Sequence, residues 1–397
     1  MQKNDIKIKV SKRCLERLLN GHLWIFDNDI KSIDGTYSNG DIVSITDDRG
    51  KFIARGYIND NSKIIIRILT FKDEIIDRDF FKRRIENALK HRLELGWTLK
   101  GTFRLIFSEG DFLPGLIVDK YEDVLVIQIL TLGIEKWKAE IVEILKGILS
   151  PKAIIKRSDV SVRQKEGLEL RKGFLCGEET GKKIITLDNL KFEIDFLEGH
   201  KTGFYLDQSE NRRIIEPYVR GRRVLDCFPY TGSFAIYAIK YGAKDVTCVE
   251  DSGKVMEGLK RNIALNGFED KINAIKADAF NWLRDAYKKG EKFDCVMLDP
   301  PSFVKTKDAR HGAERGYKDI NLMGLKLLND NGCLITSSCS HNISQTRFLD
   351  ILHDAAKDAG CLLQIMENRS QSRDHPILLS MPETHYLKFV VAKKIAR

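Results

Sequence analysis

Acidic residues close a series of short apolar runs in the second half of the chain. Asp226, Glu250, Asp278 and Asp299 each end or directly follow such a run, and helical patterns separate the runs. Strands that alternate with helices form a parallel sheet, so their carboxyl ends meet at one edge, where ligands of open α/β sheets bind. The four carboxylates are therefore predicted to line one ligand crevice, with helix capping as the alternative role for each.

The turn after the first of these strands narrows the kind of ligand. VLDCFPYTGSFA (224–235) is a strand, a turn containing Gly232 and a helix start, but it lacks the paired glycines that let a backbone approach a pyrophosphate. Glu250 lies 18 residues after Gly232, about the spacing at which an acid meets ribose hydroxyls. Asp278 could accept a hydrogen bond from an adenine amino group. The pattern favours a nucleotide without a pyrophosphate, such as S-adenosylmethionine (SAM), over NAD.

A cysteine follows another strand of the same predicted sheet. Cys339 comes directly after GCLITSS, where a strand end meets the crevice. The chain has eight cysteines, and their spacing indicates neither a disulfide framework nor a zinc site, so no metal is expected. Most of them are expected to be small buried hydrophobic residues. Cys339 is the exception, a candidate nucleophile whose exposure decides its reactivity.

Composition sets the general class of protein. The 397 residues are 43% hydrophobic, which suits two or three domains at about 100–200 residues each and excludes a wholly disordered chain. We find no run of roughly 20 apolar residues and no secretory signal, so we expect no membrane span and a cytoplasmic protein. The net charge of +9 is spread evenly, which suits a polyanionic partner bound by a surface assembled in three dimensions.

The pattern of strands and helices predicts three segments. Residues 1–74 form a small β-rich domain with a hairpin at 40–58 that turns at Asp48-Arg49-Gly50. Residues 75–185 form a mixed α/β domain, with helices at 78–95 and 135–149 and strands at 103–109, 115–121, 124–130 and 153–157. Residues 186–397 contain the alternating sheet, preceded by a hairpin at 183–198 that turns at Asp188-Asn189. A last strand is predicted at 386–394, with an antiparallel position in the sheet as one option.

Motifs along the whole chain resemble a known family. The alternating domain resembles class I SAM-dependent methyltransferases. More narrowly, the chain resembles the ribosomal RNA cytosine-carbon-5 methyltransferases that carry an N-terminal PUA domain. The motifs that carry this resemblance are, in order, GHLWIF (21–26), FLPGLIVDKY (112–121), GHKTGFYLDQSENR (199–212), DPPSF (299–303), SSCS (337–340) and MPETHYLKFVV (381–391).

The resemblance implies a PUA-like RNA-binding domain, a substrate-docking middle domain and a Rossmann-like domain that holds SAM. It also implies that residues of the segment before the first strand help to enclose the cofactor. The expected cofactor-binding residues are Phe204, Tyr205, Asp207, Gln208, Asp226, Phe228, Tyr230, Thr231, Gly232, Glu250, Asp278, Ala279, Asp299 and Pro300.

The reaction implied is methyl transfer from SAM to carbon 5 of a cytosine in 23S ribosomal RNA. Carbon 5 is a poor nucleophile, and covalent catalysis is the usual solution: a thiolate adds to carbon 6 and makes carbon 5 reactive. Cys339 is the expected nucleophile, and by the resemblance Asp299 contacts the base edge. Some RNA cytosine methyltransferases carry a second cysteine where this chain has Ser302, so a single-cysteine mechanism is expected here. The base that removes the carbon-5 proton is not identified.

RNA contacts are predicted from aromatic and basic residues. Stacking and phosphate contacts hold unpaired RNA, and a base inside folded RNA must be extruded before it reacts. Core packing is the alternative for Trp24 and Phe303, and a solvated surface loop is the alternative for 305–317, which is expected to be a loop near RNA. The candidates are Trp24, Arg55, Arg67, Phe303, Lys305, Arg310 and His375.

Two other functions stay open at this point. DPPSF also resembles the motif with which amino-group methyltransferases grip an exocyclic amine, a reaction that needs no cysteine. A non-enzymatic RNA-binding or ribosome-assembly factor with a vestigial SAM pocket is the second alternative. A homodimer is one option for the oligomeric state.

Overall fold

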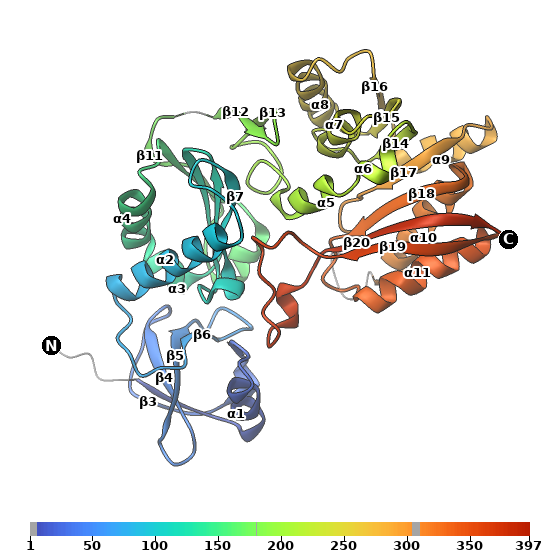
Figure 1. Ribbon diagram of the computed structural model, residues 1–397. Coiled ribbons are helices and arrows are strands. Elements are labelled where there is room, and N and C mark those ends of the chain that lie inside the picture. Colours follow the sequence, from blue (N-terminus) through green and yellow to red (C-terminus); the bar gives the residue numbers. More distant parts are fainter. Residues whose placement is uncertain (1–5, 180, 304–309) are drawn as a thin grey trace. The chain divides into compact units, whose positions relative to one another are not determined.

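The computed structural model describes residues 6–179, 181–303 and 310–397. The chain divides into two compact units. The first comprises Met1–Ile185, Ile194–Leu206 and Arg373–Thr384, and the second comprises Thr186–Glu193, Asp207–Ser372 and His385–Arg397. Figure 1 shows the elements of both. None of the helices in the described ranges is long and apolar enough to cross a membrane.

The N-terminal part of the first unit is a six-stranded sheet in the order β2-β6-β5-β4-β1-β3. Gly50, at φ +81°, forms the turn between antiparallel strands β4 and β5, which confirms the predicted hairpin. A helix, α1, which the sequence patterns did not predict, begins after Ser11, whose hydroxyl accepts the Cys14 N–H. The elements are β1 (Lys7–Val10), α1 (Lys12–Leu19), β2 (Trp24–Ile25), β3 (Ile30–Asp34), β4 (Ile42–Thr46), β5 (Phe52–Ile58) and β6 (Ile66–Thr70).

A five-stranded sheet, ordered β11-β10-β9-β8-β7, follows in the same unit. Phe81 and Ile85 of α2 and Ile141 and Leu145 of α4 are buried in one core with these strands, as the helical spacing predicted for α2. The predicted helix at 135–149 is two helices, α3 and α4. The elements are α2 (Arg78–Glu94), β7 (Thr102–Phe107), β8 (Leu116–Tyr121), β9 (Val124–Ile129), α3 (Leu132–Lys136), α4 (Lys138–Leu149), β10 (Ala153–Ser158) and β11 (Arg171–Gly177).

The segment Arg373–Thr384 belongs to the first unit although it lies late in the sequence. Met381 is buried in the core of the six-stranded sheet. Asp374 contacts the middle sheet: its carbonyl oxygen accepts from Arg92 Nη2 at 2.7 Å, and its Oδ2 accepts from the Arg104 backbone N–H at 2.8 Å. This segment is therefore part of the packing of both N-terminal sheets. The boundaries 1–74, 75–185 and 186–397 stay a prediction.

A two-stranded hairpin joins β12 (Lys182–Leu187) to β13 (Leu190–Asp195). Its turn residues Asp188 and Asn189 both have positive φ, +50° and +65°, as a two-residue type I′ turn requires. The hairpin and its turn are as predicted.

The second unit contains a seven-stranded sheet in the order β16-β15-β14-β17-β18-β20-β19. The first five strands are parallel, and β20 runs antiparallel to β18, as the sequence allowed. The strands are β14 (Arg223–Cys227), β15 (Asp245–Glu250), β16 (Ile272–Lys276), β17 (Phe293–Leu298), β18 (Leu328–Ser338), β19 (Cys361–Arg369) and β20 (Lys388–Ala396). The strand order reverses between β14 and β17, where open α/β sheets bind their ligands.

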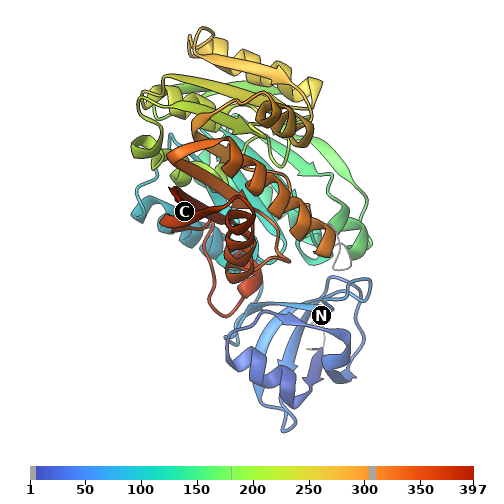
Figure 2. The same ribbon diagram turned by 90° about the vertical axis from the view of Figure 1, so that its right-hand side faces the viewer.

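Helices α9, α10 and α11 pack side by side and share one apolar core with the sheet (Figures 1 and 2). Helices α7 and α8 contribute no residue to that core and contact β14, β15 and β16 instead. The helices are α5 (Ser209–Arg213), α6 (Glu216–Val219), α7 (Ser233–Lys240), α8 (Gly253–Leu265), α9 (Ala279–Lys288), α10 (Arg310–Leu327) and α11 (Gln345–Asp358). Short 3₁₀ helices lie at Asp27–Asp29, Ser108–Asp111, Ser161–Glu166, Leu206–Gln208 and Pro382–Thr384.

One predicted loop is wrong in part. The charged stretch 305–317 is helical from Arg310, where α10 begins, and Lys305 lies outside the described residues. Ala313, Tyr317 and Ile320 fall at helical spacing and are buried, so they fix this stretch as a helix despite its charge.

Candidate cofactor and catalytic site

The parallel sheet brings five predicted residues to one edge. Asp278, Glu250, Asp226, Asp299 and Cys339 lie at or just beyond the carboxyl ends of β16, β15, β14, β17 and β18, which are neighbours in that order, with Asp226 the next-to-last residue of β14. Asp226 and Asp299 lie on the two sides of the strand-order reversal. The pKa of the Asp226 carboxyl is raised well above its usual value, chiefly because the group is buried and next because of the Asp299 charge. The predicted convergence of the acids is therefore present.

The loop between β14 and α7 has an unusual backbone. Phe228, Tyr230 and Gly232 all have left-handed φ angles, +69°, +51° and +86°. Non-glycine residues adopt this region rarely, and such residues gather at ligand sites. At Gly232 an added Cβ would lie 2.3 Å from Leu259 Cδ1, so another residue would force Leu259 to shift and would also be strained by the positive φ.

The same loop fixes the Glu250 carboxylate. Backbone N–H groups of Ser252, Tyr230 and Asp251 donate to it, the first over 3.0 Å. Burial raises the pKa of Glu250 above its usual value, and these donors oppose that rise. A carboxylate held in this way at a strand end is suited to accept hydrogen bonds from ribose hydroxyls.

Two buried polar atoms beside this loop lack a partner. Asp226 Oδ2 and Thr231 Oγ1 are buried, and no hydrogen-bond partner for either lies in the part of the chain that the structure describes. Buried polar groups are normally hydrogen-bonded, and exceptions call for an explanation such as a missing ligand. These residues therefore fit a polar nucleoside cofactor.

Asp278 caps a helix, the role that the sequence offered as the alternative to ligand binding. It is exposed, and its Oδ1 accepts the Asn281 N–H at 2.9 Å at the start of α9, whose first residue is the buried Ala279. A contact between Asp278 and adenine stays a prediction.

The enclosing residues before the first strand divide between the units. Phe204 and Tyr205 belong to the first unit, where Lys201 Nζ lies 4.3 Å from the Tyr205 ring centre. Asp207 and Gln208 belong to the second unit, where Asp207 Oδ2 accepts from the Tyr386 hydroxyl at 2.6 Å.

A chain of hydrogen bonds holds Asp299. Gln208 Nε2 donates to Asp299 Oδ2 at 3.2 Å, and the Ser337 hydroxyl donates to Asp299 Oδ1. Asn211 Nδ2 donates to Gln208 Oε1 at 2.7 Å, and Arg369 Nε donates to Asn211 Oδ1 at 3.2 Å. Sequence reasoning missed Ser337, Asn211 and Arg369 as supports. Ser337 is the first serine of SSCS, so the motif carried a signal that was used only for its cysteine.

Cys339 differs from most other cysteines of the chain. None of the eight is in a disulfide; six are buried, and Cys176 and Cys339 are half-buried. Cys339 follows β18, and its nearest strand partner, β20, carries the buried Lys388 opposite Ser338. A nucleophile needs this kind of partial exposure next to positive charge.

The DPPSF turn packs partly against the core. Pro300 is buried, and the half-buried Phe303 ring lies 4.8 Å from the Tyr317 ring and 5.8 Å from the Phe280 ring, centre to centre. Core packing is therefore part of the role of Phe303.

Comparisons with known proteins agree with this geometry. Residues 8–71 match the family model of the PUA-like domain, and residues 210–352 match the family model described as "Conserved hypothetical protein 95". The chain is 44% identical to ribosomal RNA large subunit methyltransferase I of Tolumonas auensis over 383 residues, 95% of this chain and 96% of the relative. It is 43% identical to the protein of that name from Shewanella denitrificans, with 98% of each chain covered.

The chain belongs to the ribosomal RNA large subunit methyltransferase I family. Its fold is similar over 98% of its length to a Streptococcus mutans protein assigned as a SAM-dependent methyltransferase, with TM-score 0.83, 19% identity and 99% of that chain covered. A second solved structure, assigned as a methyltransferase and complexed with SAH (S-adenosylhomocysteine), gives TM-score 0.84 at 19% identity, with 98% of this chain and 99% of that chain covered. The predicted PUA-like domain and Rossmann-like fold are confirmed, and SAM is the cofactor of the family.

Four of the predicted RNA-contacting residues of this family member, Trp24, Arg55, Arg67 and His375, have partners within the protein. Trp24 Nε1 donates to Glu109 at 2.8 Å, and Arg55 Nη2 pairs with Asp73 at 2.8 Å. Arg67 is buried and pairs with Glu166 at 2.9 Å, while His375 is buried with Nδ1 2.8 Å from Asp374 Oδ1. Contacts of these residues with RNA stay a prediction.

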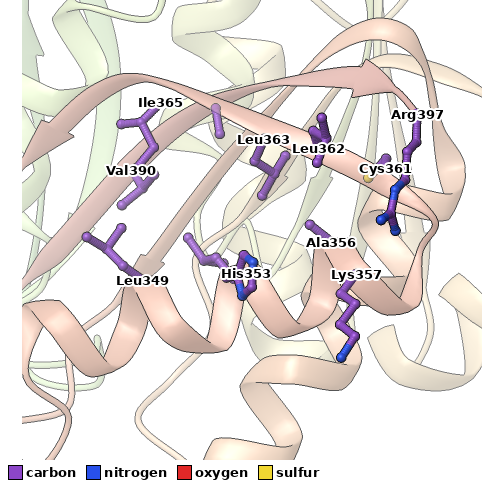
Figure 3. Close-up of a pocket in the computed structure, with 12 residues that line it drawn as sticks. Leu349, His353, Ala356, Lys357, Cys361, Leu362, Leu363, Ile365, Val390 and Arg397 are labelled. Atoms are coloured by element: carbon purple, nitrogen blue, oxygen red, sulfur yellow. The ribbon is translucent and has the colours of Figure 1, made fainter.

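Two further observations delimit the site of this methyltransferase. No group of three or more His, Cys, Asp or Glu residues able to hold a metal is present within 6–179, 181–303 and 310–397. A cavity of about 600 Å³ lies between α11 and strands β19 and β20, and it is lined by mostly apolar side chains (Figure 3). Among the residues that the structure describes, none of the predicted site residues lines this cavity.

Proposed function

We propose that this chain transfers a methyl group from SAM to carbon 5 of a cytosine in large-subunit (23S) ribosomal RNA, with Cys339 as a covalent nucleophile. The observation that carries the proposal is the position of Cys339. It is half-buried at the end of β18, next to β17, whose end carries Asp299 in a fixed hydrogen-bonded position.

The proposed reaction begins with the Cys339 thiolate. The thiolate adds to carbon 6 of the cytosine, forming a carbon–sulfur bond and moving the electrons of the 5,6 double bond toward carbon 5 and the ring. Carbon 5 would then bond to the methyl group of SAM, while the methyl–sulfur bond of the sulfonium breaks and SAH leaves as the neutral thioether. A base removes the carbon-5 proton, and the electron pair left behind restores the double bond and expels the thiolate.

Asp299 and its supports orient the base in this scheme. The Gln208 amide and the Ser337 hydroxyl hold the Asp299 carboxyl group at the strand end, where it is suited to contact the base edge. Fixed polar groups of this kind stabilise charge that develops on a ring during reaction.

The methyl donor would be held by residues on the other side of the strand-order reversal. Glu250 would accept hydrogen bonds from the ribose hydroxyls. The buried oxygens of Asp226 and Thr231 would find their hydrogen-bond partners on the cofactor. The loop at Phe228–Gly232, with its left-handed φ angles, would shape the pocket. Within the second unit, the side chain of Asp207 would help to enclose it.

Substituting Cys339 tests the covalent mechanism. Cys339→Ala is expected to fold and bind SAH but to lose methyl transfer by at least about a thousandfold, because removal of a covalent nucleophile leaves only positioning and binding. Cys176→Ala, at the other half-buried cysteine, is the matched control and is expected to keep full activity. RNA containing 5-fluorocytosine is expected to form a denaturant-resistant adduct with the wild type and Cys176→Ala, but not with Cys339→Ala.

The product identifies the reaction. Large-subunit RNA is isolated from cells that lack this protein and is then treated with the enzyme and SAM. Mass analysis of its nucleosides is expected to show 5-methylcytidine that the untreated RNA lacks. Full activity of a folded Cys339→Ala variant, with a methylated exocyclic amine as product, would eliminate the covalent scheme in favour of an amino-group methyltransferase using DPPSF. Absence of any methylated product would favour the assembly-factor function.

A further inference from the structure

We propose that Lys388 is a positioning residue for Cys339: its buried ammonium group fixes the backbone that follows the cysteine and serves as the counter-ion of the thiolate. This inference rests on the proposed function, in which Cys339 is the nucleophile.

The sheet places the two residues close together. Strands β18 and β20 are antiparallel, with Ser338 directly opposite Lys388, and Cys339 is the next residue after β18. Lys388 is only 2% exposed, so its charge lies inside the protein. Its Nζ donates to the carbonyl oxygen of Ser340 at 2.5 Å and to that of Tyr386 at 2.8 Å. The first of these bonds fixes the carbonyl group of Ser340, the residue that directly follows the cysteine.

These carbonyl oxygens satisfy two donors of the ammonium group but carry no full charge. A buried ammonium group without an anionic partner is strongly unfavourable, so buried lysines normally pair with a carboxylate. Across the described ranges, Lys388 forms no ion pair with an aspartate or glutamate. The negative charge of the Cys339 thiolate is the one that stabilises the charged form of Lys388. The role of counter-ion is therefore open to the thiolate.

The effect of each charge on the other is mutual. Burial lowers the pKa of Lys388 from its usual value to about 8, and the charge of Cys339 opposes that change. By the same interaction, the ammonium charge must favour the Cys339 thiolate over the thiol, as nearby cations do for reactive cysteines. Lys388 would thus increase the fraction of Cys339 that can attack a base near neutral pH.

Other titratable groups nearby act differently. The Tyr317 hydroxyl, on α10, is buried and its pKa is raised, so it is neutral near pH 7. His385 has a lowered pKa, because it is partly buried and because the Lys388 charge opposes a second cation. The Tyr386 hydroxyl donates a hydrogen bond to Asp207. Lys388 is therefore the cation among these groups that can stabilise an anion at Cys339.

The test measures the reactivity of Cys339 itself. The full-length protein, without RNA, is treated with iodoacetamide over pH 5.5 to 10, and the alkylation rate at each cysteine is followed by peptide mass analysis. In Lys388→Met the rate at Cys339 near pH 7 is expected to fall at least tenfold, with its midpoint at higher pH. Lys388→Arg is expected to retain the wild-type profile, because arginine keeps the charge. Cys176, on β11, gives an internal reference whose profile is expected to be the same in all proteins.

Specific outcomes would overturn the inference. An unchanged Cys339 profile in folded Lys388→Met would do so. If Lys388→Met does not fold, Lys388→Gln serves as a second neutral variant. A Cys339 midpoint in Lys388→Arg that rises to that of a free thiol would also overturn it, because the charge is then without effect.

The two experiments test the covalent mechanism and the role of Lys388 independently. A shifted alkylation profile together with full activity of Cys339→Ala would overturn only the covalent mechanism. A 5-fluorocytosine adduct together with an unshifted profile would overturn only the role of Lys388.

Discussion

The side-chain amide of Gln208 donates a hydrogen bond to the Asp299 carboxylate over 3.2 Å, although 91 positions separate the two residues in the sequence. The direction of this amide is fixed, because Asn211 donates to its oxygen at 2.7 Å and so leaves the nitrogen facing Asp299. Asn211 in turn accepts from Arg369 on β19. Asp299 is therefore held by a polar chain that reaches from the strand end to the far edge of the sheet.

Gln208→Leu should reduce methyl transfer with little change in folding. Leucine fills a similar volume but cannot donate to Asp299, and a hydrogen bond to a charged group contributes about 1.5–3 kcal/mol. We expect kcat to fall by about 10- to 100-fold, measured with the large-subunit RNA substrate under SAM saturation. Gln345→Leu, which removes the amide that pairs with Asn368, is the matched control and should keep its activity. A wild-type kcat in Gln208→Leu would show that this bond does not matter for the reaction.

Glu250→Gln should weaken binding of SAM and SAH. The neutral amide loses two properties of the carboxylate, its charge and the second acceptor oxygen that faces the backbone N–H groups of the loop. Calorimetric titration with SAH is expected to show at least about a tenfold rise in Kd, by the same hydrogen-bond energies. Glu257→Gln on α8, with its side chain 74% exposed, is the control. Equal affinity of the two variants would remove Glu250 from the cofactor site.

Much of the second unit could be predicted from sequence because its signals are local. A parallel strand buried on both faces is a short apolar run, and the residue that ends it is adjacent in sequence. The strand ends at Asp226, Glu250 and Asp299 were therefore predictable. Cys339 was predictable for the same reason, with the motif around it.

Long-range partners could not be predicted in this way. Arg67 and His375 are residue types that often contact RNA. In the folded chain, however, Arg67 pairs with Glu166, and the His375 ring packs against Phe107. Residues 310–317 look like a loop because only Ala313 and Tyr317 of them are apolar and helix-spaced. Lys388 lies inside an apolar strand pattern, and only the register of β18 with β20 places it opposite Ser338, the last residue of β18.

Arg92→Met should destabilise the first unit. Arg92 is fully buried, pairs with Asp111 and donates to the Asp374 carbonyl, so it joins α2 to the segment Arg373–Thr384. Removing one partner of a buried ion pair costs about 3–5 kcal/mol, because the other charge is left buried. Lys90→Met on the same helix, with its side chain 74% exposed, should change stability by less than about 0.5 kcal/mol.

Tryptophan fluorescence during urea unfolding can follow the first unit alone. Of the four tryptophans, only Trp282 lies in the second unit, so a Trp282→Phe background leaves Trp24, Trp97 and Trp137 as reporters. Because the two units can unfold separately, this background avoids a mixed transition. The same midpoint for Arg92→Met and Lys90→Met would mean that the buried pair does not stabilise this unit.

Asp226→Asn should change how stability depends on pH. The raised pKa of Asp226 means that the folded protein holds this proton more tightly than the unfolded chain does. The stabilising contribution of the protonated carboxyl is thus fully present below about pH 4, the usual aspartate pKa, and is lost as the pH rises through the raised folded value. Asparagine stays neutral at every pH and can still accept the Ala235 N–H.

We therefore expect the Tm of Asp226→Asn to equal or exceed the wild-type Tm at pH 8, with the difference shrinking as the pH falls toward 4.5. Scanning calorimetry at several pH values measures this difference, and Asp285→Asn, on the exposed side of α9, corrects for the general effect of removing one acid. Binding of SAH should weaken in Asp226→Asn if the buried Oδ2 accepts from the cofactor. A Tm of Asp226→Asn below the wild-type Tm at pH 8, with this deficit shrinking toward pH 4.5, would mean that the carboxyl is ionised in the folded protein and that the pocket stabilises its negative charge and not its proton.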